Sequence, residues 1–307
     1  MSASNRIVVA NAPVSFGAFE ITVGIDPNVP DGVQVLDQVK AAGYDGIDLG
    51  PAGYLGSTQE LESRLRDRHL GLAGGYLELP YSDPASLKPA LHELDVLLDM
   101  FDAAGTPVHG LKPKPTLADK GSEERRANPG KAAHNRALGL NSEGWKKFAD
   151  GLEQAVARCR ERGYEPTFHH ETGTYIEAAW EIEKMLELTS IDVCLDTGHL
   201  LVGQGDPVKA MKDWKGRINH LHLKDARLEV IKGIVSEAAS AMEIWRRGAF
   251  CALGKGDVDI EEILRLTKQD YAGWLVVEQD VLPDASAPKR PGLDQIANRQ
   301  YLAARGF

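Results

Sequence analysis

Cysteine and long apolar runs are both scarce in this sequence. Its three cysteines, Cys159, Cys194 and Cys251, are widely spaced and form no C-x-x-C pair. This spacing argues against a disulfide framework and a cysteine-based zinc site, and it favours a reducing compartment. No segment approaches the roughly 20 apolar residues that span a bilayer, and the short N-terminal apolar run is broken by Asn11 and Pro13. We therefore expect a cytoplasmic protein.

Positive charge is also in short supply. The 35 lysines and arginines are outnumbered by 45 aspartates and glutamates, which gives a formal net charge of -10 and a pI near 5.4. A protein of this charge has no general attraction to nucleic acid or to anionic membranes. The expected partner is a small molecule.

The sequence does contain a regular alternation of elements. Across its 307 residues, short β-rich runs alternate with longer segments of helical periodicity, which is typical of parallel strands covered by helices. The predicted strands are Arg6–Asn11, Gly46–Gly50, Leu70–Leu77, Pro107–Lys112, Pro166–Glu171, Asp192–Asp196, Ile218–Leu223 and Trp274–Gln279. Eight strands in a chain of this length predict an α/β fold, a single (β/α)8 TIM barrel over residues 1–307.

Two long segments interrupt this alternation, at about 114–140 and 226–256. The predicted helices between the strands are Val33–Ala42, Thr58–Arg66, Leu87–Ala103, Ser142–Arg162, Ile176–Leu188 and Asp259–Leu266. Loops that follow barrel strands form the catalytic face, so insertions there usually shape or cover a substrate pocket. The second insertion contains the apolar segments 230–234 and 241–245, which could close over the pocket or pack against another subunit in a homo-oligomer.

Polar residues end four of the predicted apolar strands. They are Glu171 in PTFHHE, Asp196 in IDVCLD, His222 in INHLHLKD and Glu278 in WLVVEQD. The carboxyl ends of barrel strands meet at one face, so these side chains should converge. Three carboxylates and an imidazole suit Mn²⁺ or Mg²⁺, and the imidazole also admits Co²⁺ or Zn²⁺. The pattern predicts a divalent metal site, with Mn²⁺ as the first choice.

Such a site favours an uncharged substrate. Three carboxylates around a divalent ion leave a local charge of about -1, which disfavours an anion but accepts a neutral hydroxy-ketone. Chelation of a carbonyl and a neighbouring hydroxyl would acidify the adjacent C–H and stabilise an enediolate. His169 faces the same side as Glu171 and could act as the base, or it could orient Glu171.

Three further residues are candidates for contacts with the substrate. By strand alternation Lys224 shares the direction of His222, where it could neutralise an oxyanion or bridge carboxylates. Lys112, at the end of the fourth predicted strand, could contact hydroxyls. Phe16 follows the first strand and could form an apolar wall against a sugar ring.

Several longer segments carry a family resemblance. They are GYDGIDLGPAGYLG at Gly43–Gly56, GLNSEGWKKFADGL at Gly139–Leu152, HHETGTYIE at His169–Glu177, LDTGH at Leu195–His199, HLHLKD at His220–Asp225 and LGKGDVDI at Leu253–Ile260. With them the sequence resembles the xylose isomerase-like barrel superfamily of sugar phosphate isomerases and epimerases, nearly from end to end. Within it the chain looks most like inosose dehydratases.

The resemblance implies that Glu171, Asp196, His222 and Glu278 take the metal positions and that His199 faces the substrate. One position departs from the dehydratase pattern, which carries H-x-H-x-G-T where this chain has Glu171 as the third residue. A carboxylate there resembles the epimerase and isomerase branches, in which this residue also moves a proton, and Glu171 and Glu278 could then form a two-base pair.

The leading hypothesis is a metal-dependent, inosose-dehydratase-like lyase acting on a keto-sugar or keto-cyclitol. The alternatives are a sugar isomerase or epimerase, a lyase that eliminates the aglycone from a 3-keto-glycoside, and a non-catalytic sugar-binding barrel.

Overall fold

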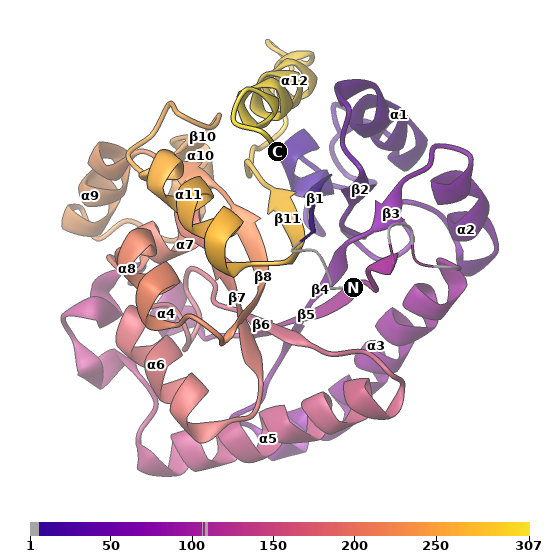
Figure 1. The fold of residues 1–307 in the computed structure, drawn as a ribbon. Helices are drawn as coiled ribbons and strands as arrows, with labels where there is room; N and C mark the ends of the chain where they lie inside the picture. Colours follow the sequence, from indigo (N-terminus) through magenta and orange to yellow (C-terminus); the bar gives the residue numbers. More distant parts are fainter. Residues whose placement is uncertain (1–5, 106, 108–109) are drawn as a thin grey trace.

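A ring of parallel strands surrounded by helices forms the centre of the protein (Figure 1). The computed structural model describes residues 6–105, 107 and 110–307. The strands follow one another in the order β3-β2-β1-β11-β8-β7-β6-β5-β4. Their bounds are β1 Ile7–Asn11, β2 Gly46–Ile47, β3 Gly71–Leu72, β4 Gly74–Leu79, β5 Lys114–Asp119, β6 Thr167–His169, β7 Asp192–Asp196, β8 Ile218–Leu223 and β11 Gly273–Val277. A separate antiparallel pair consists of β9 Asp225–Ala226 and β10 Phe250–Cys251.

The ring closes at Ala73, the residue between β3 and β4. The nitrogen of Ala73 donates to the carbonyl of Ile47 in β2, and its carbonyl accepts from the nitrogen of Lys114 in β5, both at 2.9 Å. β3 and β4 are therefore two pieces of one barrel strand. The predicted (β/α)8 fold is confirmed.

Local sequence sets the ends of the covering helices. In α1, Asp31 accepts a hydrogen bond from the nitrogen of Gln34 at the start, and Gly43 ends the helix with a φ of 91°, which glycine adopts without strain. The α-helices are α1 Gly32–Ala42, α2 Thr58–Arg66, α3 Pro84–Ala103, α4 Glu123–Arg126, α5 Ser142–Glu161, α6 Ala179–Leu188, α7 Thr197–Val202, α8 Pro207–Asp213, α9 Leu228–Ser236, α10 Met242–Arg246, α11 Ile260–Asp270 and α12 Arg290–Ala303. Short 3-10 helices are η1 Pro13–Phe16, η3 Lys131–Ala133 and η4 Arg136–Leu138.

The fourth barrel strand lies later in the chain than the sequence predicts. The predicted range was Pro107–Lys112, of which residues 108 and 109 lie outside the described residues; the others form no strand, and β5 begins at Lys114. Pro115 lacks the N–H that a central strand normally donates. The pairing of β5 with β6 starts only at Thr116, so this loss is tolerated. The predicted insertion at 114–140 accordingly begins after β5.

Both insertions are well anchored. In α4, the buried guanidinium of Arg125 pairs with Glu181 at 2.7 Å and with Glu177 at 3.2 Å. The second insertion has a hydrophobic cluster of its own, separate from the main core between strands and helices. Its buried members are Val202, Ala226, Ile231, Ile234, Ile244, Ala249 and Phe250.

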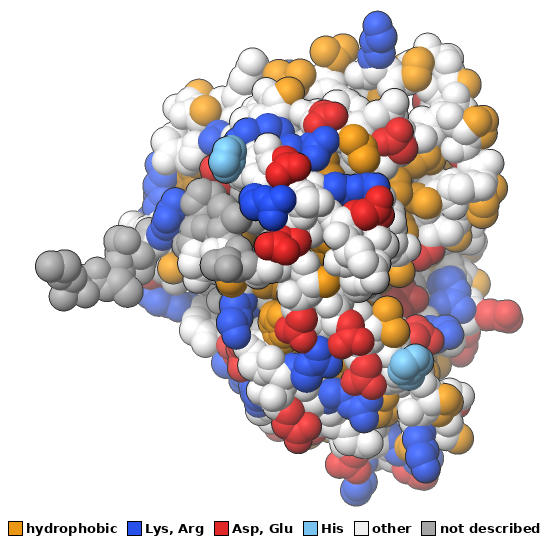
Figure 2. Space-filling model, turned by 90° about the vertical axis from the view of Figure 1, so that its right-hand side faces the viewer, with side chains coloured by type: hydrophobic (Ala, Val, Ile, Leu, Met, Phe, Trp, Pro, Cys, Tyr) orange, Lys and Arg blue, Asp and Glu red, His pale blue; other side chains and the backbone are white. Residues whose placement is uncertain are grey.

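The surface shows no single-sign patch on the face drawn in Figure 2, where Lys and Arg side chains are interspersed with Asp and Glu. Within the described part of the chain, no helix combines the length and the apolar character needed to cross a membrane.

Candidate active site

A pocket of about 560 Å³ opens at the carboxyl ends of the barrel strands. Its floor is built by polar residues that end or directly follow strands: Asp48, His169, Glu171, His222, Lys224, Glu278 and Asp280. We count with them the buried Asp196, which ends β7 and contacts His169 and Lys224. The insertion at 226–256 contributes Met242 and Trp245 to the wall. The segment 226–256 therefore forms part of the pocket wall.

Four side chains at the floor form a compact group. The possible ligand atoms of His169, Asp196, His222 and Glu278 all lie within 4.8 Å of one another. His222 Nδ1 is 3.2 Å from a carboxylate oxygen of Glu278 and 3.8 Å from Asp196 Oδ2, which is itself 3.4 Å from His169 Nε2. Three of the predicted metal ligands therefore converge, and His169 stands where the sequence predicts Glu171.

The separations in this group, 3.2, 3.4 and 3.8 Å, are close to those of ligands around a divalent ion. Ligand atoms about 2.0–2.2 Å from an ion, at angles of 90–109°, stand about 3–3.6 Å apart. Within the described residues, both ring nitrogens of His222 are buried without a hydrogen bond of ordinary geometry, which is costly unless something else satisfies them. Burial lowers the pKa of His169 to about 4, so its imidazole is neutral and has a lone pair to offer at neutral pH.

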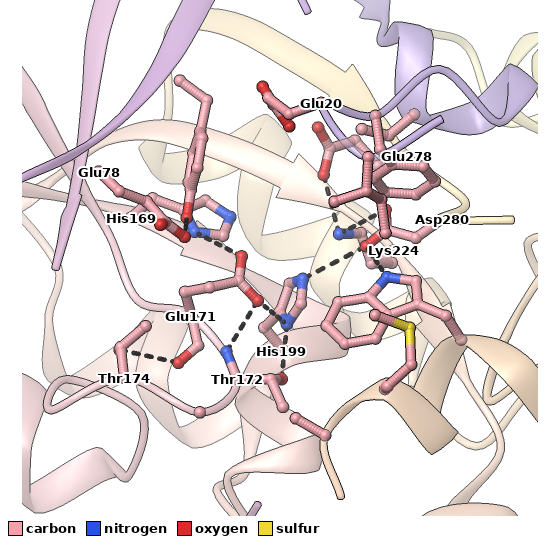
Figure 3. A pocket seen from close by; sticks show the side chains of 18 of the residues that line it. Glu20, Glu78, His169, Glu171, Thr172, Thr174, His199, Lys224, Glu278 and Asp280 are labelled. Carbon is pink, nitrogen blue, oxygen red and sulfur yellow. Dashed lines mark hydrogen bonds and ion pairs between the residues drawn. The ribbon is translucent and has the colours of Figure 1, made fainter. Parts of the chain in front are cut away.

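Lys224 is the fixed cation of the floor. Its Nζ lies 3.0 Å from Asp196 and 2.9 Å from both Glu278 and Asp280, as Figure 3 shows for the last two. Burial opposes the charge, but these three carboxylates together raise the pKa of Lys224 well above its usual value. Its stem passes Gly198, where a Cβ would lie 2.7 Å from Lys224 Cγ.

Glu171 faces a different set of partners. Figure 3 shows it between His169 and His199: one carboxylate oxygen lies 3.0 Å from His199 Nδ1 and accepts from the nitrogen of Thr172 at 2.8 Å, and the other lies 3.6 Å from His169 Nδ1. Burial, partly offset by His199 and Lys224, raises the pKa of Glu171 to about 8. A carboxyl group with such a pKa can exchange a proton near neutral pH.

The floor carries more negative than positive charge. Its carboxylates are Asp48, Glu171, Asp196, Glu278 and Asp280. Among the described floor residues, Lys224 is the only lysine or arginine. This imbalance is relieved by protonation, and burial indeed raises the pKa of Asp48 to about 7; a bound cation would relieve it too.

Two residues predicted to contact the substrate lie elsewhere. Lys112 precedes β5 rather than ending a strand, so it lies at the opposite end of the barrel, where its Nζ donates to the carbonyl of Gly163 at 2.9 Å. Phe16 is only 3% exposed and packs in the main core. Phe19, three residues further along the chain, lines the pocket instead.

Two floor residues escaped the sequence analysis although they follow the same strand-end pattern. Asp48 comes directly after β2, and one of its oxygens lies 3.6 Å from His222 Nε2. Asp280 comes two residues after Glu278 and lies 3.5 Å from His199 Nε2. Reading every strand end for polar residues would have found Asp48, whereas Asp280 lies at a strand end that was read but was passed over in favour of Glu278.

Comparison with known proteins gives a consistent picture. The chain matches the family described as "Xylose isomerase-like TIM barrel" over residues 36–297. It is 28% identical over 289 residues to an inosose dehydratase of Geobacillus kaustophilus, covering 92% of this chain and 91% of the relative.

Two solved structures share the fold. The probable 3-DHS dehydratase AsbF from Bacillus anthracis has a TM-score of 0.66 at 13% identity, covering 96% of this chain and 98% of AsbF. The IolI protein, solved with a bound zinc atom, has a TM-score of 0.70 at 11% identity, with 97% of each chain covered. The predicted enzyme class, a sugar isomerase/epimerase or dehydratase, agrees with these relatives. The chain belongs to the xylose isomerase-like TIM barrel family.

Proposed function

We propose that this protein is a metal-dependent lyase that removes a proton next to the carbonyl of a keto-sugar or keto-cyclitol and then expels a β-substituent. The observation that carries the proposal is the compact group of His169, Asp196, His222 and Glu278 beside the Glu171–His199 pair. Together they combine a metal-binding geometry with a group able to accept a proton. The similarity to an inosose dehydratase supports elimination of water as the reaction.

The residues suited to hold the ion are Asp196, His222 and Glu278, with a fourth ligand from the end of β6. Glu171 is the predicted fourth ligand, and it suits Mn²⁺ because carboxylates match this hard ion better than the imidazole of His169 does. A divalent ion at this position would polarise the carbonyl of the substrate and make the neighbouring C–H more acidic.

The other residues supply positioning and proton transfer. Glu171 takes the proton. His199 keeps the carboxylate of Glu171 in the pocket, and the hydroxyl of Thr172 contacts His199 at 2.8 Å. Lys224 fixes Glu278 and Asp280 on the opposite side through its two contacts of 2.9 Å. Neutral hydroxyls of the substrate would find acceptors among these carboxylates.

An epimerase or isomerase is the second candidate. Glu171 and Glu278 come from different strands and both line the pocket, so one could remove a proton and the other return it to the opposite face. A cytoplasmic location, a homo-oligomeric state and the choice of Mn²⁺ belong to the proposal as well.

The test is exchange of substrate C–H protons in D₂O. Protein loaded with Mn²⁺ and then desalted is incubated with inososes, ketoses and keto-glycosides and followed by NMR. We expect metal-dependent exchange or a new product, and the product distinguishes elimination from epimerisation. Glu171→Gln should lower the rate by roughly 10²–10⁴-fold, whereas Glu143→Gln, which changes a 75% exposed carboxylate of α5, should not. No exchange across the panel, in protein shown to hold its metal, would overturn the proposal.

A further inference from the structure

The upper part of the pocket differs in chemistry from its floor. Above the carboxylates, the walls are apolar, and they come from three separate segments. The apolar collar, as we name it, consists of Val14, Phe19, Ile21, Met242, Trp245 and Leu282. Charged residues also reach the rim, among them Glu20 and Glu78 in Figure 3.

Hydrogen bonds hold parts of the collar in place. The indole nitrogen of Trp245 donates to Asp280 at 3.2 Å, which connects the second insertion to the floor. The nitrogen of Val281 donates to the carbonyl of Val14 at 3.4 Å, so Leu282 lies beside the first loop. The collar is therefore continuous with the polar floor, and one ligand can contact both.

Behind the pocket, Trp245 packs against the cluster of the second insertion and Val14 against another apolar cluster, but much of the collar surface stays open. Ile21 is 57% exposed, and Phe19, Met242, Trp245 and Leu282 are each only half-buried. Exposed apolar surface gathered at one site is typical of a binding site. A cyclitol or a free sugar held at the floor by its hydroxyls offers this surface little apolar area, because hydroxyls placed against apolar walls lose their hydrogen bonds to water. The pocket volume of about 560 Å³ also lies in the range of sites that enclose ligands larger than a single ring.

We propose that the substrate is a keto-glycoside with an aromatic aglycone, whose sugar ring lies on the polar floor and whose aglycone fills the collar. This inference rests on the proposed function and specifies its substrate. An aromatic ring matches the collar because Phe19 and Trp245 offer it ring contacts and Met242 a polarisable sulfur.

The elimination balances without a further reactant. In a 3-keto-glycoside, Glu171 takes the proton from C2, and the electrons of that C–H bond form the C1=C2 double bond. The C1–O bond breaks, and the aglycone leaves with its electron pair as a phenolate that takes a proton from water. The sugar remains as a conjugated enone, with no net oxidation or reduction.

Binding of matched glycosides tests the collar without requiring turnover. Dissociation constants of phenyl and methyl β-glucoside are measured by calorimetry on the Mn²⁺-loaded protein. Burial of the phenyl ring should favour the phenyl compound by about 10- to 50-fold. The variants Ile21→Ser and Met242→Ser should each reduce this ratio several-fold. Ile25→Ser is the matched control, since Ile25 is 74% exposed on the same segment but does not line the pocket, and it should leave the ratio unchanged.

Equal dissociation constants, no detectable binding of the phenyl compound, or a ratio that the Ile21 and Met242 variants do not change would overturn the aromatic subsite. The proposed function fails separately, through absence of C–H exchange with every keto substrate. Metal-dependent exchange on inososes together with equal glycoside binding would reject the collar and keep the metal chemistry.

Discussion

At the scale of single residues, Lys224 governs the electrostatics of the site. One buried ammonium contacts Asp196, Glu278 and Asp280. Buried charges are tolerated only when they are paired, so Lys224 allows three carboxylates to converge in one place. Its own charge does not balance them. Burial opposes protonation of His199 and His222, but neighbouring acidic groups raise the pKa of both; a bound cation would take the place of such protons.

The two candidates for the fourth metal ligand can be separated by metal affinity. We expect Glu171→Gln to weaken Mn²⁺ binding by more than about 100-fold, because it removes a charged ligand. His169→Gln should weaken it by about 10- to 100-fold, the usual cost of losing a residue that orients a ligand. Titration calorimetry with Mn²⁺ measures both. The reverse order would assign the fourth position to His169, and unchanged affinity in both variants would contradict a contribution from β6.

The sequence predicted much of this floor. The rule that polar residues end apolar strands found Asp196, His222 and Glu278, because their strands are long enough to be recognised. Which of His169 and Glu171 joins them could not be predicted, since His169 ends β6 and Glu171 follows it by two residues, and the choice depends on side-chain rotamers. Lys112 was misplaced only because its strand was predicted too early.

At the scale of elements, the packing of β11 against β2 includes a close contact between Trp274 and Gly46. Trp274, in β11, is 2% exposed, and its ring lies against β2. A Cβ at Gly46 would stand 2.6 Å from the Trp274 ring and 2.8 Å from the carbonyl of Gly71. The large ring and the absent side chain are therefore complementary.

Gly46→Ala should destabilise the protein by about 1–3 kcal/mol, the usual cost of overpacking a core. Gly233→Ala is the matched control, because its nearest neighbour, Glu237 Oε1, lies 3.8 Å away and alanine favours the helix. That variant should be neutral or up to about 1 kcal/mol more stable. Urea unfolding measures both, and equal stability of Gly46→Ala and the parent would contradict the packing argument.

Length alone did not decide which elements could be predicted, because the 14-residue helix α12 is not among the predicted helices. α2 and the strands β7 and β8 have the predicted bounds, since each shows several turns or alternations of its pattern. The two-residue strands β2 and β3 carry too little pattern to set their ends. The six-residue helix α7 was missed. Its N-cap residue is Asp196, which accepts a hydrogen bond from the nitrogen of His199 at 2.8 Å, and Asp196 had been considered only as a metal ligand.

At the scale of the whole molecule, a bound ion would connect the strands of the barrel. Its proposed ligands lie on or next to β6, β7, β8 and β11, four neighbours in the sheet. A ligand that binds only the folded state stabilises that state. Metal binding should therefore appear in the stability of the entire barrel.

At free Mn²⁺ 100-fold above its dissociation constant, we expect the free energy of unfolding to rise by about 2.7 kcal/mol over the chelator-treated protein. Urea unfolding with and without Mn²⁺ measures the difference. In Asp196→Asn the gain should largely disappear. A gain of equal size in this variant, or none in the parent, would contradict metal binding at the floor.

The second insertion has a hydrophobic cluster of its own, whereas the floor residues lie on barrel strands that belong to the main core. Substitutions in α10 can therefore reshape the upper wall while leaving the strand ends in register. Because the upper wall and the floor belong to separate parts of the fold, relatives can change the substrate that they bind while keeping the same reactive groups. Divergence within the family would then concentrate in residues 226–256, and a graft of this segment between relatives would transfer preference for a substrate rather than the type of reaction.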